Sequence, residues 1–323
     1  MRLRTITGTD LHASVICLGA LPFGVTLSED LSFTLMDRFL AEGGNFIDTA
    51  LVYGEWLPDG KGRSERTVGK WVKQRRTRDR VIIGTKGAHP RLSSMDVPRL
   101  ARDEIVADLD ESLGNLQTDY IDLYWLHRDD PRRPVAEILH TLNEQGERGK
   151  IRYFGCSNWR LDRIQAAQDY AAEHGIRGFA GNQLMWSLAV PNHAALFDPA
   201  MVTMDAATKA YHLRTGQAAM AYSSQAGGLF TRLASGSPDD LPAGQRALYA
   251  GEENLRRLQR LQQVAQAQDL PVGVVALAYL VSHPFPAYAL SGCSNTDQLQ
   301  QNLRAGDVEL EPGALEYLEH GPD

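Results

Sequence analysis

The sequence predicts a closed (β/α)₈ barrel of the TIM-barrel type, preceded by a β-hairpin that caps it. Short β-rich runs alternate with amphipathic helical patterns along the whole chain, which is typical of repeated βαβ units around a parallel sheet. No shift in composition divides the 323 residues, and a closed sheet leaves no strand edge to protect. We therefore expect a single domain over residues 1–323, a size that α/β barrels commonly reach.

Eight runs are candidate barrel strands. They cover residues 15–21, 45–50, 81–86, 121–127, 153–158, 178–184, 218–224 and 287–293. Between them apolar residues recur at helical spacing, as in Ile105, Leu109 and Leu113, so each helix is expected to bury one stripe on the sheet. Residues 3–14 alternate in character around Thr7-Gly8-Thr9-Asp10, which predicts a hairpin that caps the barrel floor.

One long polar segment interrupts this pattern after the seventh strand. Residues 233–251 contain Ser235-Gly236-Ser237-Pro238-Asp239-Asp240 and are predicted to form a loop, a candidate mobile flap over a ligand. An open dinucleotide-binding sheet is the alternative fold. It is disfavoured because no Gly-x-Gly-x-x-Gly follows an early strand.

Composition narrows the classes of partner. The chain is 43% apolar and 23% charged, and its formal charge of −7 includes no basic block, which argues against nucleic acid. Cys17, Cys156 and Cys293 lie far apart without Cys-x-x-Cys spacing, which argues against a structural zinc site and a disulfide framework. No apolar run has the length of a membrane span. We therefore expect a cytoplasmic protein.

Candidate catalytic groups stand where predicted strands end. Asp48 ends the second strand, Tyr53 follows it, Lys86 ends the third and His127 ends the fourth. In a parallel barrel the chemistry belongs at the C-terminal strand ends. Each residue alone has an ordinary explanation, as a turn residue, a packed aromatic, a solvated strand end or a structural histidine. Their coincidence on successive strand ends favours a shared site.

These four side chains suit carbonyl reduction, which needs a hydride source and a proton donor to the developing alkoxide. Tyr53 is the candidate donor, and a neighbouring ammonium at Lys86 is expected to lower its pKa. Asp48 is expected to keep a buried Lys86 charged. His127 is expected to hydrogen-bond the substrate oxygen and orient it.

The sequence resembles the aldo-keto reductase family over nearly its whole length. The matching segments, in order, are 45–50 with Tyr53-Gly54, Ser64-Glu65 with Gly69, Thr85-Lys86, 119–124 with His127, 149–152 with 155–158, Asn182-Gln183, 221–223, and Gly292 through Gln298-Leu299 to Asn302. The resemblance implies that Asp48, Tyr53, Lys86 and His127 form the family's catalytic tetrad, with Tyr53 as general acid and base. It is similar to the branch that includes potassium-channel β subunits and bacterial sugar-type reductases.

The same resemblance implies a nicotinamide cofactor. Ser157, Asn158 and Gln183 would hold the carboxamide, Tyr222 would stack on the ring, and Ser223 and Gln225 would line the pyrophosphate path. A packed core aromatic is the ordinary explanation for Tyr222.

At the adenosine end, the implied contacts are Gly292, Ser294, Gln298, Gln301 and Asn302, beside a helix that starts near Asn295. Many strict NADPH enzymes of this family carry Lys and Arg where this chain has Gly292 and Gln298, and Gln301 stands where Glu is usual. NADPH is the expected cofactor, held through polar contacts, with NADH as the alternative.

The substrate pocket is expected to be walled by the loops after Tyr53 and His127. Trp56, Arg128 and Asp129, with Asp130, would suit a carbonyl compound such as a sugar, since aromatic faces pack on C–H groups and carboxylates accept hydroxyl protons. Loop packing and an ion-pair cluster are the ordinary explanations, and Trp186 is either a further wall or core.

Two other functional classes remain open. One is a cofactor-bearing regulatory or binding subunit with little turnover, which the complete tetrad argues against. The other is a metal-dependent hydrolase, but no His-x-His stands at a strand end and no metal site is predicted. The sequence leaves the oligomeric state open.

Overall fold

The computed structural model describes residues 1–321. Eight parallel strands close into a barrel in which β10 pairs with both β9 and β3. The strands are β3 (Ile16–Gly19), β4 (Phe46–Asp48), β5 (Ile82–Gly87), β6 (Ile121–Leu126), β7 (Ile151–Ser157), β8 (Gly181–Met185), β9 (Ala218–Tyr222) and β10 (Ala287–Ser291). All eight predicted strands are confirmed, and most are shorter than predicted because several of their C-terminal residues turn into loops.

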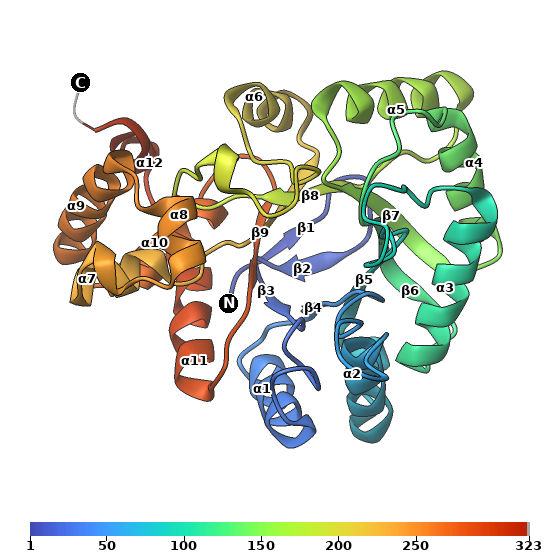
Figure 1. The fold of residues 1–323 in the computed structure, drawn as a ribbon, viewed down its shortest axis with the longest axis horizontal. Helices are drawn as coiled ribbons and strands as arrows, with labels where there is room; N and C mark the ends of the chain where they lie inside the picture. The colour runs from blue at the N-terminus through green and yellow to red at the C-terminus, as the bar shows by residue number, and fades with distance from the viewer. Residues whose placement is uncertain (322–323) are drawn as a thin grey trace.

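Helices surround the barrel (Figure 1). They are α1 (Glu29–Ala41), α2 (Arg63–Arg75), α3 (Arg102–Leu116), α4 (Val135–Glu147), α5 (Leu161–His174), α6 (Ala206–Thr215), α7 (Leu229–Ser235), α8 (Ala243–Tyr249), α9 (Glu252–Ala267), α10 (Val272–Val281), α11 (Thr296–Arg304) and α12 (Pro312–His320). The predicted stripe on α3 is confirmed for Ile105 and Leu109, which are fully buried, while Leu113 is partly buried and packs against the same core. The (β/α)₈ fold is therefore confirmed.

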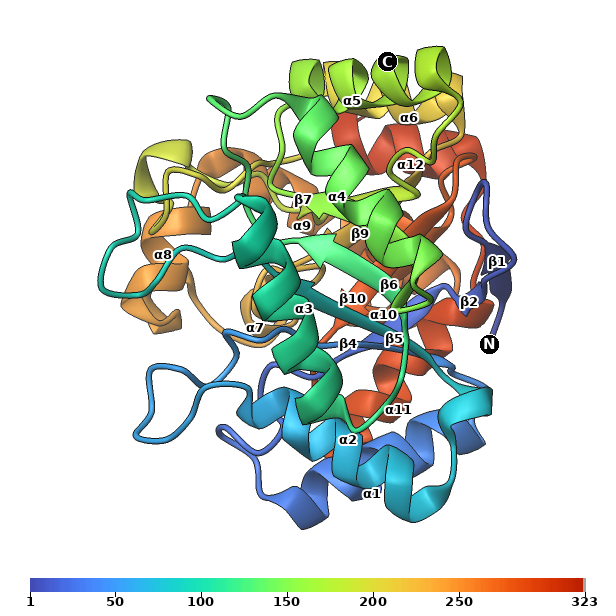
Figure 2. The same ribbon diagram turned by 90° about the vertical axis from the view of Figure 1, so that its right-hand side faces the viewer.

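A hairpin closes the floor of the barrel. Strands β1 (Leu3–Thr5) and β2 (His12–Ser14) pair antiparallel, and Figure 2 shows them at one end of the barrel, with the long loops at the other end. Ile6 and Leu11 are buried in one apolar cluster with barrel-interior side chains such as Phe46 and Trp125. The predicted cap is confirmed, and the open end is left for ligands.

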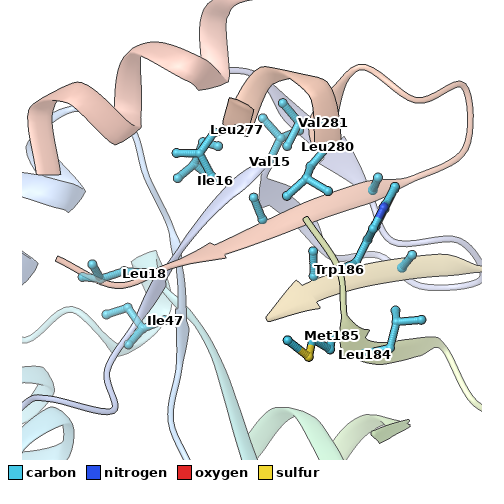
Figure 3. Close-up of a cluster of buried hydrophobic side chains, with 14 of the residues drawn as sticks. Val15, Ile16, Leu18, Ile47, Leu184, Met185, Trp186, Leu277, Leu280 and Val281 are labelled. Carbon is cyan, nitrogen blue, oxygen red and sulfur yellow. The ribbon is translucent and has the colours of Figure 1, made fainter. Parts of the chain in front are cut away.

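The most apolar helix packs on the barrel rather than facing solvent. In α10, Leu277, Leu280 and Val281 lie close to Val15 and Ile16 at the start of β3 (Figure 3). Burial of this apolar surface favours the fold. Within residues 1–321, no single helix meets the length and hydropathy of a membrane span, and only α9 with α10, bent by 97°, meets them as a pair.

The predicted loop over residues 233–251 is wrong for most of its length. It contains the end of α7, a 3₁₀ turn (Pro238–Asp240) and α8. Its polar residues serve as caps: Ser237 begins the turn with its side chain, and Pro242 stands at the N-terminus of α8. Tyr249 is buried, which anchors the helix. The cavity described below is lined instead by residues just before this segment.

Candidate active site

A cavity of about 1070 Å³ opens at the C-terminal ends of the barrel strands. It reaches from Asp48 and His127 on one side to Gln301 and Asn302 on the other. This volume exceeds the roughly 300–1,000 Å³ of an ordinary small-molecule site, so the cavity has room for a cofactor together with a substrate. Tyr53, Asp48 and His127 line it, whereas Lys86 lies beneath the surface with 1% of its area exposed.

Lys86 joins three parts of the site. Its ammonium donates hydrogen bonds to the Asp48 carboxylate, to the backbone oxygen of Thr49 at 2.7 Å and to the Tyr53 hydroxyl oxygen at 3.1 Å. The other carboxylate oxygen of Asp48 accepts from Gln183 Nε2 at 3.0 Å. All three donors of the ammonium are therefore used. The strand ends of β4, β5 and β8 are tied together at one point.

The buried charges at this point stabilise one another. Burial acts to lower the pKa of Lys86, but the negative charge of Asp48, followed by Tyr53, outweighs it, and the pKa of Lys86 lies above its usual value. Burial also raises the pKa of Asp48, and Lys86 opposes that effect. A buried charge with a partner in contact avoids the cost of an isolated one. We therefore treat Lys86 as an ammonium paired with an Asp48 carboxylate.

His127 is a neutral side chain at the cavity wall. Its backbone N–H donates to Gly87 O at 2.9 Å, which aligns the loop after β6 with the end of β5. Burial, reinforced by His89 and Arg128, lowers the pKa of His127 well below its usual value. Among residues 1–321, its buried Nδ1 has no hydrogen-bond partner. A bare nitrogen there costs less than an unpaired N–H, which favours the proton on Nε2.

The residues expected at the nicotinamide end come together around one amide. Asn158 has a left-handed backbone (φ 59°) at the end of β7, and its Oδ1 accepts from Tyr222 Oη at 2.6 Å and from Val202 N at 3.1 Å. Its Nδ2 donates to Ser157 Oγ at 3.1 Å. Ser157, Asn158, Gln183 and Tyr222 all line the cavity. Burial raises the pKa of Tyr222, so its ring stays uncharged.

The loop after β9 makes a tight turn beside the cavity. Ser223, Ala226, Gly227 and Gly228 all have positive φ, between 49° and 78°. The N–H groups of Ala226 and Gly228 donate to Ser223 O and Gln225 O, at 2.8 Å each, and hold the turn in this shape. Arg232, one turn into α7, lines the same part of the cavity and adds a positive charge. Arg232 was not predicted from the amino-acid sequence, although the Gly227-Gly228 pair ahead of it was a signal.

The remaining predicted cofactor residues lie on the far side. Gln225 Nε2 donates to Asn302 Oδ1 at 2.9 Å, and Gln298 Oε1 accepts from Ser294 Oγ at 2.8 Å. The predicted helix start is confirmed, because Asn295 caps α11. The cavity lining includes every residue expected to hold the cofactor: Ser157, Asn158, Gln183, Tyr222, Ser223, Gln225, Gly292, Ser294, Gln298, Gln301 and Asn302. The amides and hydroxyls on this side of the cavity, with the guanidinium of Arg232, suit a dinucleotide.

The walls on the substrate side are apolar. Trp56, half exposed, lines the cavity as expected, and the sequence analysis missed the other walls. These walls are Leu21, Leu92, Met95, Phe197 and Met201. Phe197 is 85% exposed, so most of its apolar surface is available for contact with a ligand. No sequence periodicity marks these residues, because they come from irregular loops.

The expected polar wall is only partly present. Arg128 lines the cavity but is paired with Asp198 at 2.7 Å. Asp129, expected in the substrate pocket, is not among the cavity-lining residues: its carboxylate is turned to Arg163 on α5 at 3.0 Å. Asp130 is paired with Arg132 in the same way. These acids are therefore committed to ion pairs.

Two further expectations concern Trp186 and metals. Trp186 packs against Tyr279, His283 and Phe285 and is core rather than cavity wall. In the part of the chain that the structure describes, no group of three or more His, Cys, Asp or Glu side chains is placed to hold a metal ion.

The chain is similar to known oxidoreductases over almost all of its length. The model of the "Aldo/keto reductase family" matches residues 15–320. "Uncharacterized oxidoreductase YrpG" of Bacillus subtilis is 30% identical, covering 96% of this chain and 92% of that protein. An "Aryl-alcohol dehydrogenase" of Pestalotiopsis microspora is 27% identical, covering 97% and 80%. "Protein tas" of Escherichia coli is 28% identical, covering 99% and 97%.

Proposed function

Since the chain belongs to the aldo/keto reductase family, we propose that it reduces an aldehyde or ketone to an alcohol with NADPH, using Tyr53 as the proton donor. Family membership supports NAD(P)H-dependent oxidoreduction. The observation that carries the proposal further is the ammonium of Lys86, which contacts both the Asp48 carboxylate and the Tyr53 hydroxyl in the wall of a cavity that His127 also lines.

Tyr53 supplies the proton in this mechanism. Its hydroxyl faces the cavity and transfers its proton to the oxygen on which negative charge develops. The phenolate left behind accepts a hydrogen bond from the Lys86 ammonium at 3.1 Å, and a charged donor stabilises an anion more than a neutral one does. Asp48 keeps that ammonium charged in a buried place. When bound, NADPH supplies the hydride that the carbonyl carbon receives.

His127 orients the carbonyl. With its proton on Nε2, the neutral imidazole donates one hydrogen bond to the substrate oxygen. Because the ring is uncharged, it does not repel the Lys86 ammonium nearby. The ring centroids of Tyr53 and His127 are 6.1 Å apart at 78°, so two donors converge from different directions. This geometry favours one substrate orientation.

In our proposal the cofactor lies across the cavity, from the side of Gln183 to the side of Asn302. Ser157, Asn158 and Gln183 are placed to hold the carboxamide and Tyr222 to stack on the ring, which exposes one face for stereospecific transfer. Ser223, Gln225 and Arg232 are placed for the phosphates. At the adenosine end Gly292, Ser294, Gln298, Gln301 and Asn302 offer backbone and neutral polar groups. NADPH is our choice because neutral polar side chains gather there, as in the branch of the family that the sequence resembles, and NADH is the alternative.

The walls favour an apolar or aromatic carbonyl compound over a sugar. A sugar needs acceptors for its hydroxyls, and Asp129 and Asp130, which were expected to serve, are occupied by Arg163 and Arg132. Trp56, Leu92, Met95 and Phe197 offer apolar area instead. The name of one relative, an aryl-alcohol dehydrogenase, agrees with this substrate class.

The test is a spectrophotometric panel with NADPH and NADH in parallel, using aryl aldehydes, aryl ketones, sugar aldehydes and ketoses. The expected result is cofactor oxidation that is faster with aryl carbonyls and is lost in Tyr53→Phe. Faster turnover of sugars would overturn the substrate class. Cofactor binding without oxidation by any carbonyl would overturn the enzyme and favour a cofactor-bearing regulatory subunit.

A further inference from the structure

A second histidine stands beside His127 at the cavity wall. His89 follows β5, and its ring centroid is 4.7 Å from that of His127, with the ring planes at 67°. It lines the same cavity as Tyr53 and the apolar walls. The mechanism above gives His89 no role. Its neighbour in the sequence, Ala88, is fully buried and belongs to the core.

The backbone that carries His89 is strained and held from two sides. Ala88 has a left-handed backbone with φ 58°, a conformation that costs free energy for a residue other than glycine. Its N–H donates to Asp108 Oδ2 at 2.8 Å. Arg99 then donates to both carboxylate oxygens of Asp108 and, at 3.2 Å, to the backbone oxygen of His89. We call Arg99 and Asp108 the clamp.

The two charges of the clamp are shielded from solvent. Asp108 is 3% exposed and pairs with Arg99 at 2.8 Å. Strained backbones held in this way concentrate at functional sites, since packing alone does not require them. The clamp fixes the start of the loop that carries Leu92 and Met95, and with it the backbone from which the His89 ring extends.

The hydrogen bond of the His89 ring determines which of its nitrogens carries the proton. Its Nδ1 lies 2.6 Å from the backbone oxygen of Pro90, and a carbonyl oxygen only accepts, so Nδ1 carries the proton. Burial lowers the pKa of His89, and the positive charges of Arg128 and Arg99 act in the same direction. The ring is therefore neutral, and Nε2 is an acceptor. Within residues 1–321 this Nε2 has no hydrogen-bond partner.

We propose that His89 is a specificity-determining residue whose Nε2 accepts a hydrogen bond from a substrate hydroxyl next to the carbonyl held by Tyr53 and His127. This inference rests on the proposed carbonyl reduction and deepens it. The two histidines have opposite polarity: His127 donates to the carbonyl oxygen, and His89 accepts from the neighbouring group. A hydroxy ketone offers a carbonyl oxygen to His127 and a hydroxyl to His89. An unsubstituted ketone leaves Nε2 of His89 without a hydrogen-bond donor.

The preference for a hydroxyl follows from the free-energy cost of leaving Nε2 of His89 without a hydrogen bond. A ligand that covers His89 without donating to it removes water from Nε2 and leaves that nitrogen unsatisfied, which costs free energy. A ligand with a hydroxyl at that place replaces the lost water. The preference for a hydroxyl should therefore appear in kcat/KM, the quantity whose ratio measures discrimination between two substrates.

The experiment compares three ketones of similar size with the full chain and NADPH: phenyl hydroxymethyl ketone, phenyl methoxymethyl ketone and phenyl ethyl ketone. We expect the wild type to prefer the hydroxymethyl ketone. In His89→Leu, the ratio of kcat/KM for the hydroxymethyl to the ethyl ketone should fall about fivefold to tenfold, as expected for one neutral hydrogen bond. His89→Gln, whose amide oxygen also accepts, should restore part of the ratio.

The control is Met95→Leu, in the same wall, which should change both rates by a similar factor and leave their ratio within about twofold. Arg99→Met should lower the ratio without touching the cavity, because it releases the His89 backbone. An unchanged ratio in His89→Leu would overturn the proposal, as would a wild-type preference for the methoxymethyl ketone, which cannot donate.

These outcomes separate the two proposals. If no ketone or aldehyde oxidises NADPH, the carbonyl reduction fails and the role of His89 fails with it. If the ethyl ketone is reduced with a Tyr53-dependent rate and the hydroxyl gives no His89-dependent advantage, only the role of His89 fails. Melting temperatures of the variants show whether a changed ratio accompanies a loss of folding.

Discussion

The Nζ atom of Lys86 lies 3.1 Å from the hydroxyl oxygen of Tyr53 and donates a hydrogen bond to it. The two residues are 33 positions apart in the chain: Tyr53 lies in the loop after β4, and Lys86 lies near the end of the neighbouring strand β5. Their contact gives the Tyr53 hydroxyl a charged hydrogen-bond donor at the cavity wall. In the mechanism that we propose, this donor stabilises the phenolate left after proton transfer.

Tyr53→Phe should remove most turnover and keep the cofactor site. The ring stays in place while the proton donor is lost, so kcat should fall by a factor on the order of 10² to 10⁴. Stopped-flow or steady-state NADPH oxidation measures the loss, and tryptophan fluorescence quenching measures cofactor affinity. A variant that retained more than a tenth of the wild-type kcat would show that another group donates the proton.

Lys86→Met should destabilise the fold as well as abolish activity. It leaves the Asp48 carboxylate buried without its partner, a situation that costs about 3–5 kcal/mol. Urea denaturation at neutral pH gives the free energy of unfolding. The double variant Lys86→Met with Asp48→Asn removes both charges and should recover part of that loss. A double variant less stable than Lys86→Met would argue that the pair is not the cause.

Arg232→Gln should weaken cofactor binding by about tenfold, and the wild-type affinity should fall more steeply with salt than that of the variant. The reason is the placement of this guanidinium beside the positive-φ turn at Gly227 and Gly228. Fluorescence titration with NADPH at two salt concentrations is the measurement. Arg246→Gln, on α8 and outside the cavity lining, serves as the matched control. Equal affinities in the two variants would place the phosphates elsewhere.

Stability should fall as pH drops below about 6.5, the usual pKa of an unfolded histidine. Burial lowers the pKa of His283 to about 3, and its ring packs against Trp186 and Phe285, which also pack against each other. Below pH 6.5 the unfolded chain binds a proton at His283 that the folded chain does not bind. The free energy of unfolding therefore decreases as the pH falls from 6.5 to about 3.

His283→Phe should therefore flatten this slope. Between pH 6.5 and 5 the wild type should lose about 2 kcal/mol more than the variant, from a pKa difference worth 1.36 kcal/mol per unit. Urea denaturation at the two pH values measures the difference. The exposed His320→Gln is the control. Parallel pH dependences of wild type and His283→Phe would contradict the assignment.

Trp56→Ala and Asp129→Asn should differ sharply in their effect on substrate. Trp56 lines the cavity, so its removal should raise KM for an aryl aldehyde several-fold through lost apolar contact. Asp129 faces Arg163 outside the cavity lining, so Asp129→Asn should leave KM within about twofold. A larger rise in KM for Asp129→Asn than for Trp56→Ala would support the polar substrate pocket that the sequence predicted.

Much of the barrel could be predicted because its signals are local. Each strand is a short apolar run, and side-chain alternation and helical spacing reveal the elements without any knowledge of their neighbours. The hairpin around Gly8 and the helix start at Asn295 follow from turn and cap chemistry. Residues 233–251 misled the same reasoning, because cap residues at Ser237 and Pro242 have the composition of a loop.

The site was predictable only in part. Asp48, Lys86 and His127 stand at or next to strand ends, and a parallel barrel brings such ends together. The partner of Asp129 was not predictable, because Arg163 is 34 residues away on a helix whose rotation the sequence does not fix. The role of His89 depends on the left-handed backbone of Ala88, a residue that seldom adopts it.

The amino-acid sequence by itself determined the order of strands and helices and the residues carried to the open end of the barrel, since these follow from periodicity within short segments. The tertiary structure decided which charges are paired, which loops wall the cavity and which histidine nitrogen is left free. Those properties depend on contacts between distant segments, and such contacts exist only once the sheet has closed.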